Sequence, residues 1–211
     1  MAILEDLAVE VRKGDADMAK NLTEEALSQN ISAEEVLNSG LVAGMNVIGE
    51  QFKNNEIFIP EVLVAARAMK AGMQIIRPLL AEANVESLGK IIIGTVGGDL
   101  HDIGKNIVAM LLEGAGFEVV DLGADVTKEK FLEFAEKENP DVLGMSALLT
   151  TTMVFMKDMV IALEEAGLKD KMKIIIGGAP ITQSYADEIR ADGYAPDAAS
   201  AVDLVKSVMG S

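Results

Sequence analysis

The sequence predicts an α/β protein in which a four-helix bundle is followed by a doubly wound sheet of five parallel strands. Apolar residues recur at helical spacing throughout residues 1–88. After Gly89, short runs of Ile, Val and Leu alternate with amphipathic helical segments, which is typical of a parallel sheet covered by helices. We therefore expect a helical domain at 1–88 and a Rossmann-like domain at 89–211, joined by a linker near 83–89.

The helical half carries four amphipathic segments with short connections, which indicates a small bundle. Ser32 and Glu35 form a capping box before the third helix. Pro60 begins the fourth helix, and we expect Pro78 to end it. The four expected helices cover residues 3–11, 18–26, 36–45 and 60–78.

The second half predicts a flavodoxin-like sheet. The expected strands cover residues 91–96, 117–122, 142–148, 173–176 and 193–195. The expected helices cover about 104–115, 127–138, 152–166, 182–190 and a last segment from about 198. The first four strands are nearly continuous apolar runs, so we expect them to be buried on both faces. In such sheets ligands bind outside the carboxyl ends of the strands.

Composition excludes several classes of function. The formal net charge is −16, with 34 acidic against 18 basic residues, which argues against a nucleic-acid partner. The chain has no cysteine, so disulfides, iron–sulfur clusters and thiolate zinc sites are excluded. The N-terminus lacks the features of a signal peptide, and no apolar run is long enough to cross a membrane. We expect a soluble cytoplasmic protein without a membrane partner.

Residues with chemical potential follow three of the expected strands. The first strand runs into GGDLHDIGKN, which contains Asp99 and His101, the only histidine. The third ends in a turn rich in hydroxyls, from Ser146 to Thr152, and the fourth ends in Gly177–Gly178. Each feature alone has an ordinary structural explanation: a hydrogen-bonded histidine, threonines that cap a helix, and a glycine turn. The aspartates of the first loop could likewise serve the dipole of the next helix.

Other kinds of site fit these residues poorly. One imidazole and no thiol cannot build an ordinary zinc or non-haem iron site without several carboxylates. A hydrolase triad of Ser146, His101 and Asp99 would lack the Gly-x-Ser-x-Gly elbow. A Walker phosphate loop and a Gly-x-Gly-x-x-Gly fingerprint are both missing. The first strand also lacks the acidic pair of a response-regulator receiver.

The joint spacing of the three motifs is far more specific than any one of them. It reads Asp-x-His-x-x-Gly, 41 residues, Ser-x-Leu, 28 residues, Gly-Gly. This pattern resembles the base-off, His-on cobalamin-binding family at every position. The matching residues are Asp99, His101, Gly104, Ser146, Leu148, Gly177 and Gly178. The segment MNVIGEQFKNNEIFIPEVLVAARAM is similar to the helical cap domain of methionine synthase and of methyltransferase corrinoid proteins, so the resemblance covers essentially the whole chain.

The resemblance implies an axial ligand and a relay behind it. In this family the benzimidazole of the cofactor leaves cobalt and its tail is threaded into the sheet domain. His101 would then be the lower axial ligand, Asp99 would accept the other ring N–H, and the Thr152 hydroxyl would complete the relay.

The resemblance also implies a set of contacts with the corrinoid. Gly104 would let the loop and helix pack close to the tail, and the Gly-Gly pair would keep a channel open for it. Tyr194 and Ala195 would form walls of the same slot. The residues expected to contact the corrinoid in this domain are Asp102, Gly104, Ser146, Leu148, Thr150, Gly177, Gly178 and Tyr194, besides His101.

In the helical domain, Phe52 and Ile59 match the residues that cover the methyl side of cobalt. Glu56, in the same loop, could also face the cofactor. The alternative is that Phe52 and Ile59 are ordinary core residues of the bundle.

The function implied is that of a corrinoid methyl carrier, one subunit of a multi-component methyltransferase of the O-demethylase or methylamine type. Bound cobalamin in the cobalt(I) state would accept a methyl group from a substrate methyltransferase. A second methyltransferase would pass the methyl group to tetrahydrofolate or a thiol, and a reductive activase would restore the cofactor. Methoxylated aromatics and methylamines are the favoured donors.

Three alternatives stay open at this point. The chain could be a cobalamin-binding regulatory or storage module, although it lacks a DNA-binding domain and a basic face. It could be the small subunit of a cobalamin mutase, although the cap sequence argues against that. It could also be a flavodoxin-like domain that binds no corrinoid.

Overall fold

The computed structural model describes residues 2–83, 85 and 87–210. It divides into two compact units, Met1–Leu88 with Met110–Gly116, and Gly89–Ala109 with Phe117–Ser211. Part of the expected linker, at positions 84 and 86, lies outside the described residues.

The first unit contains the helical segments that the sequence predicts. Helix α1 spans Ala2–Lys13, α2 spans Ala16–Ser28, and α5 spans Ile59–Glu82. Between them runs a helical stretch made of α3 (Ala33–Val36), a π-helical segment (Leu37–Val42) and α4 (Ala43–Lys53). The Ser32 side chain accepts the Glu35 N–H, as a cap at this position should. The apolar stripes of these helices form the core, with Leu7, Val11, Val36, Leu41, Val62 and Ile76 fully buried.

The expected end of the last helix at Pro78 is wrong, because α5 continues to Glu82. Proline lacks an N–H and therefore removes one hydrogen bond to the carbonyl four residues earlier. Ile76 and Leu80 on either side of it are buried. Their burial in the core offsets the missing bond and carries the helix through the proline for one more turn.

The second unit is a five-stranded sheet in which every pair of neighbouring strands is parallel. The strands are β1 (Lys90–Thr95), β2 (Glu118–Asp121), β3 (Val142–Ser146), β4 (Lys173–Gly177) and β5 (Gly193–Ala195). Their order is β2-β1-β3-β4-β5, which confirms the predicted flavodoxin-like, doubly wound fold. The order reverses between β1 and β3, so the loops after these two strands diverge at the edge where such folds bind ligands.

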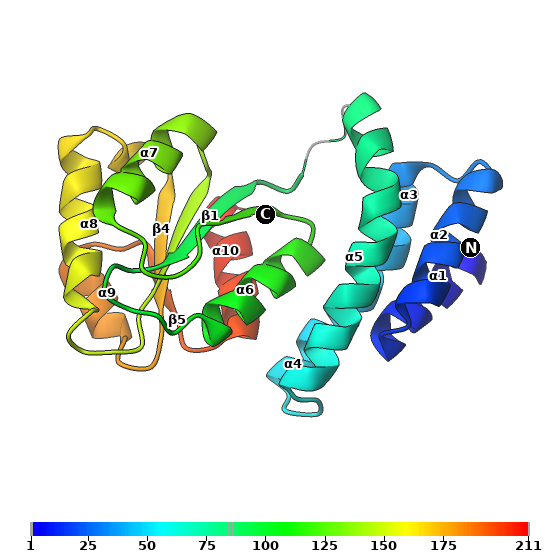
Figure 1. Ribbon diagram of the computed structural model, residues 1–211, viewed down its shortest axis with the longest axis horizontal. Helices are drawn as coiled ribbons and strands as arrows, with labels where there is room; N and C mark the ends of the chain where they lie inside the picture. The colour runs from blue at the N-terminus through cyan, green and yellow to red at the C-terminus, as the bar shows by residue number, and fades with distance from the viewer. Residues whose placement is uncertain (1, 84, 86, 211) are drawn as a thin grey trace. The chain divides into compact units, whose positions relative to one another are not determined.

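Helices cover both faces of this sheet. They are α6 (Ile103–Gly114), α7 (Lys128–Glu138), α8 (Val154–Glu165), α9 (Gln183–Ile189) and α10 (Ala198–Met209), with a 3-10 turn at Lys169–Lys171. In Figure 1, α6 and α10 lie on one face, and α7, α8 and α9 lie on the other. The main core of the unit lies between the second group of helices and the sheet, with Phe131, Leu143, Met156 and Ile174 among its buried members.

Two expectations for the strands need correction. Burial on both faces does not extend to β2, whose end residues Glu118 and Asp121 are exposed, because β2 is an edge strand. The third strand ends at Ser146 instead of Leu148. Ala147 still donates its N–H to the Gly177 carbonyl oxygen, but the Leu148 N–H turns to a side chain of the neighbouring loop.

The strand register aligns one row of residues at the carboxyl edge. Thr95 pairs with Ser146, Ser146 with Gly177, and Gly177 with Ala195. Paired residues in adjacent strands point to the same face, and successive residues in one strand point to opposite faces. The row therefore shares one face of the sheet, and Tyr194 points to the other.

Candidate functional site

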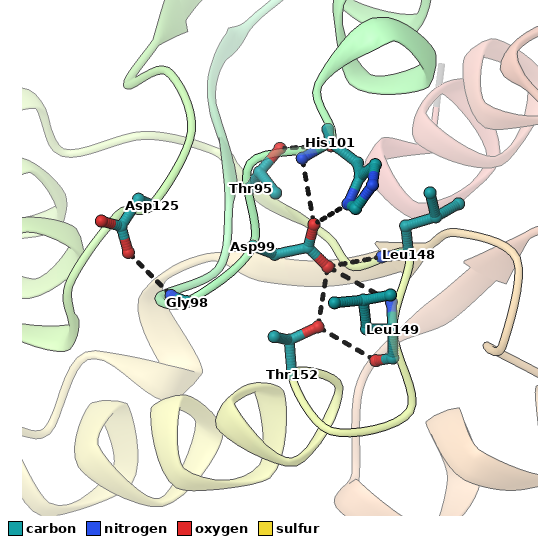
Figure 2. Close-up of polar contacts among 8 residues, drawn as sticks. All are labelled: Thr95, Gly98, Asp99, His101, Asp125, Leu148, Leu149 and Thr152. Atoms are coloured by element: carbon teal, nitrogen blue, oxygen red, sulfur yellow. Dashed lines mark hydrogen bonds and ion pairs between the residues drawn. The ribbon is translucent and has the colours of Figure 1, made fainter.

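The loop between β1 and α6 is organised around the buried carboxylate of Asp99 (Figure 2). Its Oδ1 accepts the His101 backbone N–H at 3.0 Å and the His101 ring Nδ1–H at 2.7 Å. Its Oδ2 accepts the Leu148 N–H at 2.8 Å and the Thr152 hydroxyl at 2.7 Å. A longer contact, 3.3 Å, joins Oδ2 to the Leu149 N–H. One carboxylate thus joins the loops that follow β1 and β3.

The pKa of Asp99 is set by two opposing effects. Burial raises the pKa because it disfavours the charged form. The hydrogen bonds from the Thr152 hydroxyl, the His101 and Leu148 N–H groups and the His101 ring lower it by more. The net result is a pKa well below the ordinary range of a carboxyl, so Asp99 is a carboxylate at neutral pH.

His101 presents one ring nitrogen outward. Its side chain is 53% exposed although the carboxylate behind it is fully buried. The Thr95 hydroxyl donates to the His101 carbonyl oxygen at 3.3 Å and so helps to fix the backbone of the loop. Because Asp99 accepts from Nδ1–H, the neutral imidazole keeps its proton on Nδ1 and has the Nε2 lone pair free to bind a metal.

His101 is not part of a cluster of metal-binding side chains among the described residues. Within the part of the chain that the structure describes, no three His, Cys, Asp or Glu side chains gather closely enough to hold a metal ion. A metal bound through His101 must therefore bring most of its ligands with it, as a metal inside a macrocycle does. His101 is a single, half-exposed imidazole on an accessible loop.

Thr152 is part of this arrangement and not a helix cap. Its hydroxyl lies 2.7 Å from Asp99 Oδ2 and 3.0 Å from the Leu149 carbonyl oxygen. A hydroxyl has one proton to donate, and the charged, closer carboxylate is the stronger acceptor. Met153 is the N-cap of α8 and makes no side-chain cap bond. The capping explanation of the threonines is therefore wrong for Thr152.

The glycines of the motif have different structural reasons. Gly178 has φ of +123°, and a Cβ there would lie 1.9 Å from the Ala147 carbonyl oxygen, so the fold itself requires glycine. A Cβ at Gly177 would lie 3.2 Å from the Ala195 carbonyl oxygen, which is a tight contact. These contacts explain both glycines without the expected channel. A Cβ at Gly104 would meet no atom within 4 Å beyond its chain neighbours and the backbone of its own helix, so packing against the rest of the chain does not require glycine there.

Apolar side chains surround His101 and face outward. Leu100 is 75% exposed and Ile103 is 71% exposed, on the loop and the first turn of α6. Leu148 and Leu149, from the loop after β3, are also exposed. Exposed large apolar groups that cluster at one edge indicate a surface that is covered by a ligand. A broad, flat molecule seated on the imidazole would cover this surface and would occupy the space beside Gly104.

The structure brings most of the expected sheet-domain residues to this edge, with one exception. Ser146 and Gly177 are in the aligned row, and Asp102 and Thr150 lie in the two loops. Tyr194 does not share the slot with Ala195, because adjacent strand residues face opposite sides. It packs against the core under α7, α8 and α9.

The expected cap residues lie at the ends of two helices of the first unit. Phe52 is half-buried near the end of α4, and Ile59 begins α5 with 40% of its surface exposed. Ile59 is therefore not an ordinary core residue of the bundle, and neighbouring Phe58 is 67% exposed. Glu56 is exposed, and its side chain accepts a 3.4 Å hydrogen bond from Asn54.

The β2–α7 loop supports the β1–α6 loop through Asp125, which the sequence does not predict. Asp125 accepts the Gly98 N–H at 2.7 Å, and its own N–H donates to the Asp99 carbonyl oxygen at 3.0 Å. Asp125 adopts a left-handed backbone, with φ of +53°, which aspartate tolerates better than most residues. The sequence does not reveal this role, because aspartate is common in polar loops whether or not it supports a neighbouring loop.

Comparisons with known proteins agree with this geometry. Two family profiles, both described as B12 binding domain, match residues 89–203 and 3–77. The chain belongs to the B12-binding corrinoid proteins.

Several corrinoid proteins are similar over nearly their whole length. A corrinoid protein of Desulfitobacterium hafniense is 41% identical, over 100% of this chain and 99% of the relative. Trimethylamine corrinoid protein 1 of Methanosarcina acetivorans is 45% identical, over 92% of this chain and 91% of the relative. The crystal structure of the methanol:cobalamin methyltransferase complex MtaBC from Methanosarcina barkeri contains a matching chain, with a TM-score of 0.91 and 30% identity, over 99% of this chain and 80% of that one.

The apolar edge and the open space at Gly104 fit the corrinoid that this family binds. Among the described residues of this corrinoid protein, none of the helices has the length and apolar character that crossing a membrane requires.

Proposed function

We propose that this chain is the methyl carrier of a corrinoid-dependent methyltransferase system, and that it holds its corrinoid base-off with His101 as the lower ligand of cobalt. The observation that carries the proposal is the bond between His101 Nδ1 and the Asp99 carboxylate, which leaves Nε2 free on an exposed apolar edge. When bound, the corrinoid supplies a cobalt centre that accepts and donates a methyl group.

The residues of the chain have two tasks in this proposal. The first is to fix the imidazole: Asp99 selects the Nδ1–H tautomer and orients the ring, which leaves the Nε2 lone pair free for a metal bond. The second is to hold the proton on His101 Nδ1 against the Asp99 carboxylate. The Thr152 hydroxyl and the backbone N–H groups of His101, Leu148 and Leu149 stabilise the negative charge of Asp99 behind the ring, so the carboxylate can accept the ring N–H without being a buried unpaired charge.

The proposed partners are two methyltransferases and a reductive activase. One methyltransferase supplies the methyl group, and the other passes it to tetrahydrofolate or a thiol. The name of the Methanosarcina acetivorans relative favours a methylated amine as the donor, and methoxylated aromatics are the alternative.

Methyl uptake tests the carrier function. The protein would be loaded with hydroxocobalamin, reduced, and exposed to radiolabelled methyl iodide. We expect one labelled methyl group per chain, and its transfer to a thiol when a thiol methyltransferase is added. Apoprotein treated in the same way is the control. No uptake above that control by a loaded and reduced sample would refute the carrier function.

Pairing the loaded protein with substrate methyltransferases tests the donor class. A trimethylamine- or dimethylamine-specific methyltransferase should methylate the carrier in the presence of its amine. Methylation only by an enzyme for methoxylated aromatics would establish the alternative donor.

A further inference from the structure

A second charged side chain is fully buried close to His101. Among the described residues, Asp99 and Lys105 are the only charged residues in the buried class. Lys105 lies in the first turn of α6, four positions after His101, and none of its side chain is exposed. Its ammonium contacts both carboxylate oxygens of Asp121, with 2.5 Å to Oδ1, and lies 2.6 Å from Asn106 Oδ1.

Stability alone does not account for a lysine at this position. The first turn of a helix is the positive end of its dipole and disfavours a cation. Removing the Lys105 ammonium from water is costly, and its partner Asp121 keeps 38% of its side chain exposed, so only one member of the pair is buried. What the pair does provide is direction, because the buried ammonium of Lys105 must stay within reach of the partly exposed Asp121 carboxylate.

The pair joins the start of α6 to the end of β2, beside the loop that carries His101. Asp121 is the last residue of β2, and its Oδ1 also accepts the Gly123 N–H at 2.9 Å, which fixes the carboxylate. The strand order places β2 on one side of β1 and β3 on the other. The His101 loop, which leaves β1, is therefore fastened on both sides. Asp99 ties its beginning to the loop after β3, and Lys105 ties its end to β2.

We propose that Lys105 and Asp121 form a positioning pair for His101. The pair holds the start of α6 against β2 and so keeps the loop in the conformation that aims Nε2 at the corrinoid. This inference rests on the proposed His101 ligation and adds the second anchor of the ligand loop.

Lys105→Met removes the charge and keeps an unbranched side chain that is one atom shorter, and Asp121→Asn keeps an acceptor for Gly123. The probe is aquacobinamide, which has no nucleotide base, so that a nitrogen ligand on its cobalt must come from the protein. Both variants should bind cobinamide at least about 10-fold more weakly than wild type, the scale seen when support for a metal ligand is lost. Their visible spectra should show a smaller imidazole-ligated fraction at equal occupancy.

Lys169→Met is the matched control. Lys169 pairs with Asp192 at 2.8 Å elsewhere in the same unit, and Asp192 also accepts a backbone N–H. This variant breaks an ion pair of the same kind without touching the His101 loop. It should leave the affinity and the spectrum unchanged.

Two further measurements separate positioning from simple destabilisation. In ¹⁵N NMR spectra of the apoproteins, the single histidine should be mainly the Nδ1–H tautomer in wild type and a mixture of tautomers in Lys105→Met. In a His101→Ala background, Lys105→Met should cause no further loss of cobinamide affinity.

The outcomes distinguish this inference from the proposed function. If wild type and His101→Ala bind cobinamide with identical spectra, the proposed ligation fails. If wild type shows imidazole ligation but Lys105→Met and Asp121→Asn match it in affinity, spectrum and tautomer, the positioning pair is refuted. A variant too unstable to study is replaced by the double variant Lys105→Met/Asp121→Asn, which leaves no unpaired buried charge. We expect the double variant to show the same reduced ligation, and wild-type ligation in it would also overturn the inference.

Discussion

The carboxylate of Asp99 contacts His101 twice through one oxygen, accepting the backbone N–H at 3.0 Å and the ring Nδ1–H at 2.7 Å. The first bond fixes where the residue sits, and the second fixes the tautomer and direction of its ring. Oδ2 is meanwhile held by the loop after β3. A single buried side chain therefore determines both the position and the chemical form of the proposed cobalt ligand.

Replacing Asp99 with Asn should weaken both ligation and the fold. The amide cannot accept on both sides as the carboxylate does, and hydrogen bonds to a charged group are lost, so we expect the free energy of unfolding to fall by about 2 kcal/mol at pH 7. Imidazole ligation of cobinamide should weaken about 10- to 100-fold. Urea unfolding of the apoprotein and spectral titration measure the two effects. A variant with wild-type ligation would show that the carboxylate does not support the ring.

The contribution of Asp99 to stability should depend on pH in a defined direction. The pKa of Asp99 in the folded chain is below that of an unfolded aspartate, about 3.9. The stabilisation is therefore fully present above about pH 4 and is lost as the pH falls through the lower, folded value. The difference in unfolding free energy between wild type and Asp99→Asn should shrink as the pH falls below about 4. A difference that grows on acidification would contradict this assignment, and subtracting the variant removes the effect of the other carboxyls.

Thr152 offers a graded pair of variants. Thr152→Ser keeps the hydroxyl that donates to Asp99, whereas Thr152→Val keeps the shape and removes one of the three donors to Asp99 Oδ2. We expect Thr152→Val to lose about 1–3 kcal/mol of stability and to reduce imidazole ligation, and Thr152→Ser to remain close to wild type in ligation. Thermal unfolding and cobinamide titration test both. Equal behaviour of the two variants would mean that the hydroxyl is not what matters.

The glycines should separate the requirements of the fold from those of the cofactor. Gly178→Ala should be strongly destabilising, since its Cβ would overlap the Ala147 carbonyl and its φ is positive. Gly104→Ala should leave the apoprotein as stable as wild type, or up to about 1 kcal/mol more stable, because alanine favours a helix. Cobalamin binding by Gly104→Ala should nevertheless weaken. Unimpaired binding would mean that the space beside Gly104 is not used by the corrinoid.

Much of this architecture could be predicted from the sequence because its signals are local. The short strand Gly193–Ala195 is predictable from the sequence, since apolar runs and turn residues bracket it. The passage of α5 through Pro78 could not be predicted, because it depends on burial in the core. The side of the sheet to which Tyr194 points could not be predicted either, because it follows from the strand register and not from composition.

The site shows the same division. The spacing of the motifs identified Asp99, His101 and Thr152, which the structure joins by hydrogen bonds. The Leu148 and Leu149 N–H groups that complete the shell around Asp99 are backbone donors, which every residue type except proline carries. The burial of Lys105 against Asp121 was likewise not visible, because the two residues are 16 positions apart and nothing in either neighbourhood indicates contact.

Isotope-edited electron paramagnetic resonance tests His101 ligation most directly, because His101 is the only histidine in the chain. Protein labelled with ¹⁵N-histidine and loaded with unlabelled cobalamin would be reduced to the cobalt(II) state. Each cobalt line is split by the axial nitrogen into three components by ¹⁴N and into two by ¹⁵N. We predict two components in the labelled protein and three in the unlabelled protein. Three components in both samples would show that the benzimidazole of the cofactor remains the ligand, and would contradict the account.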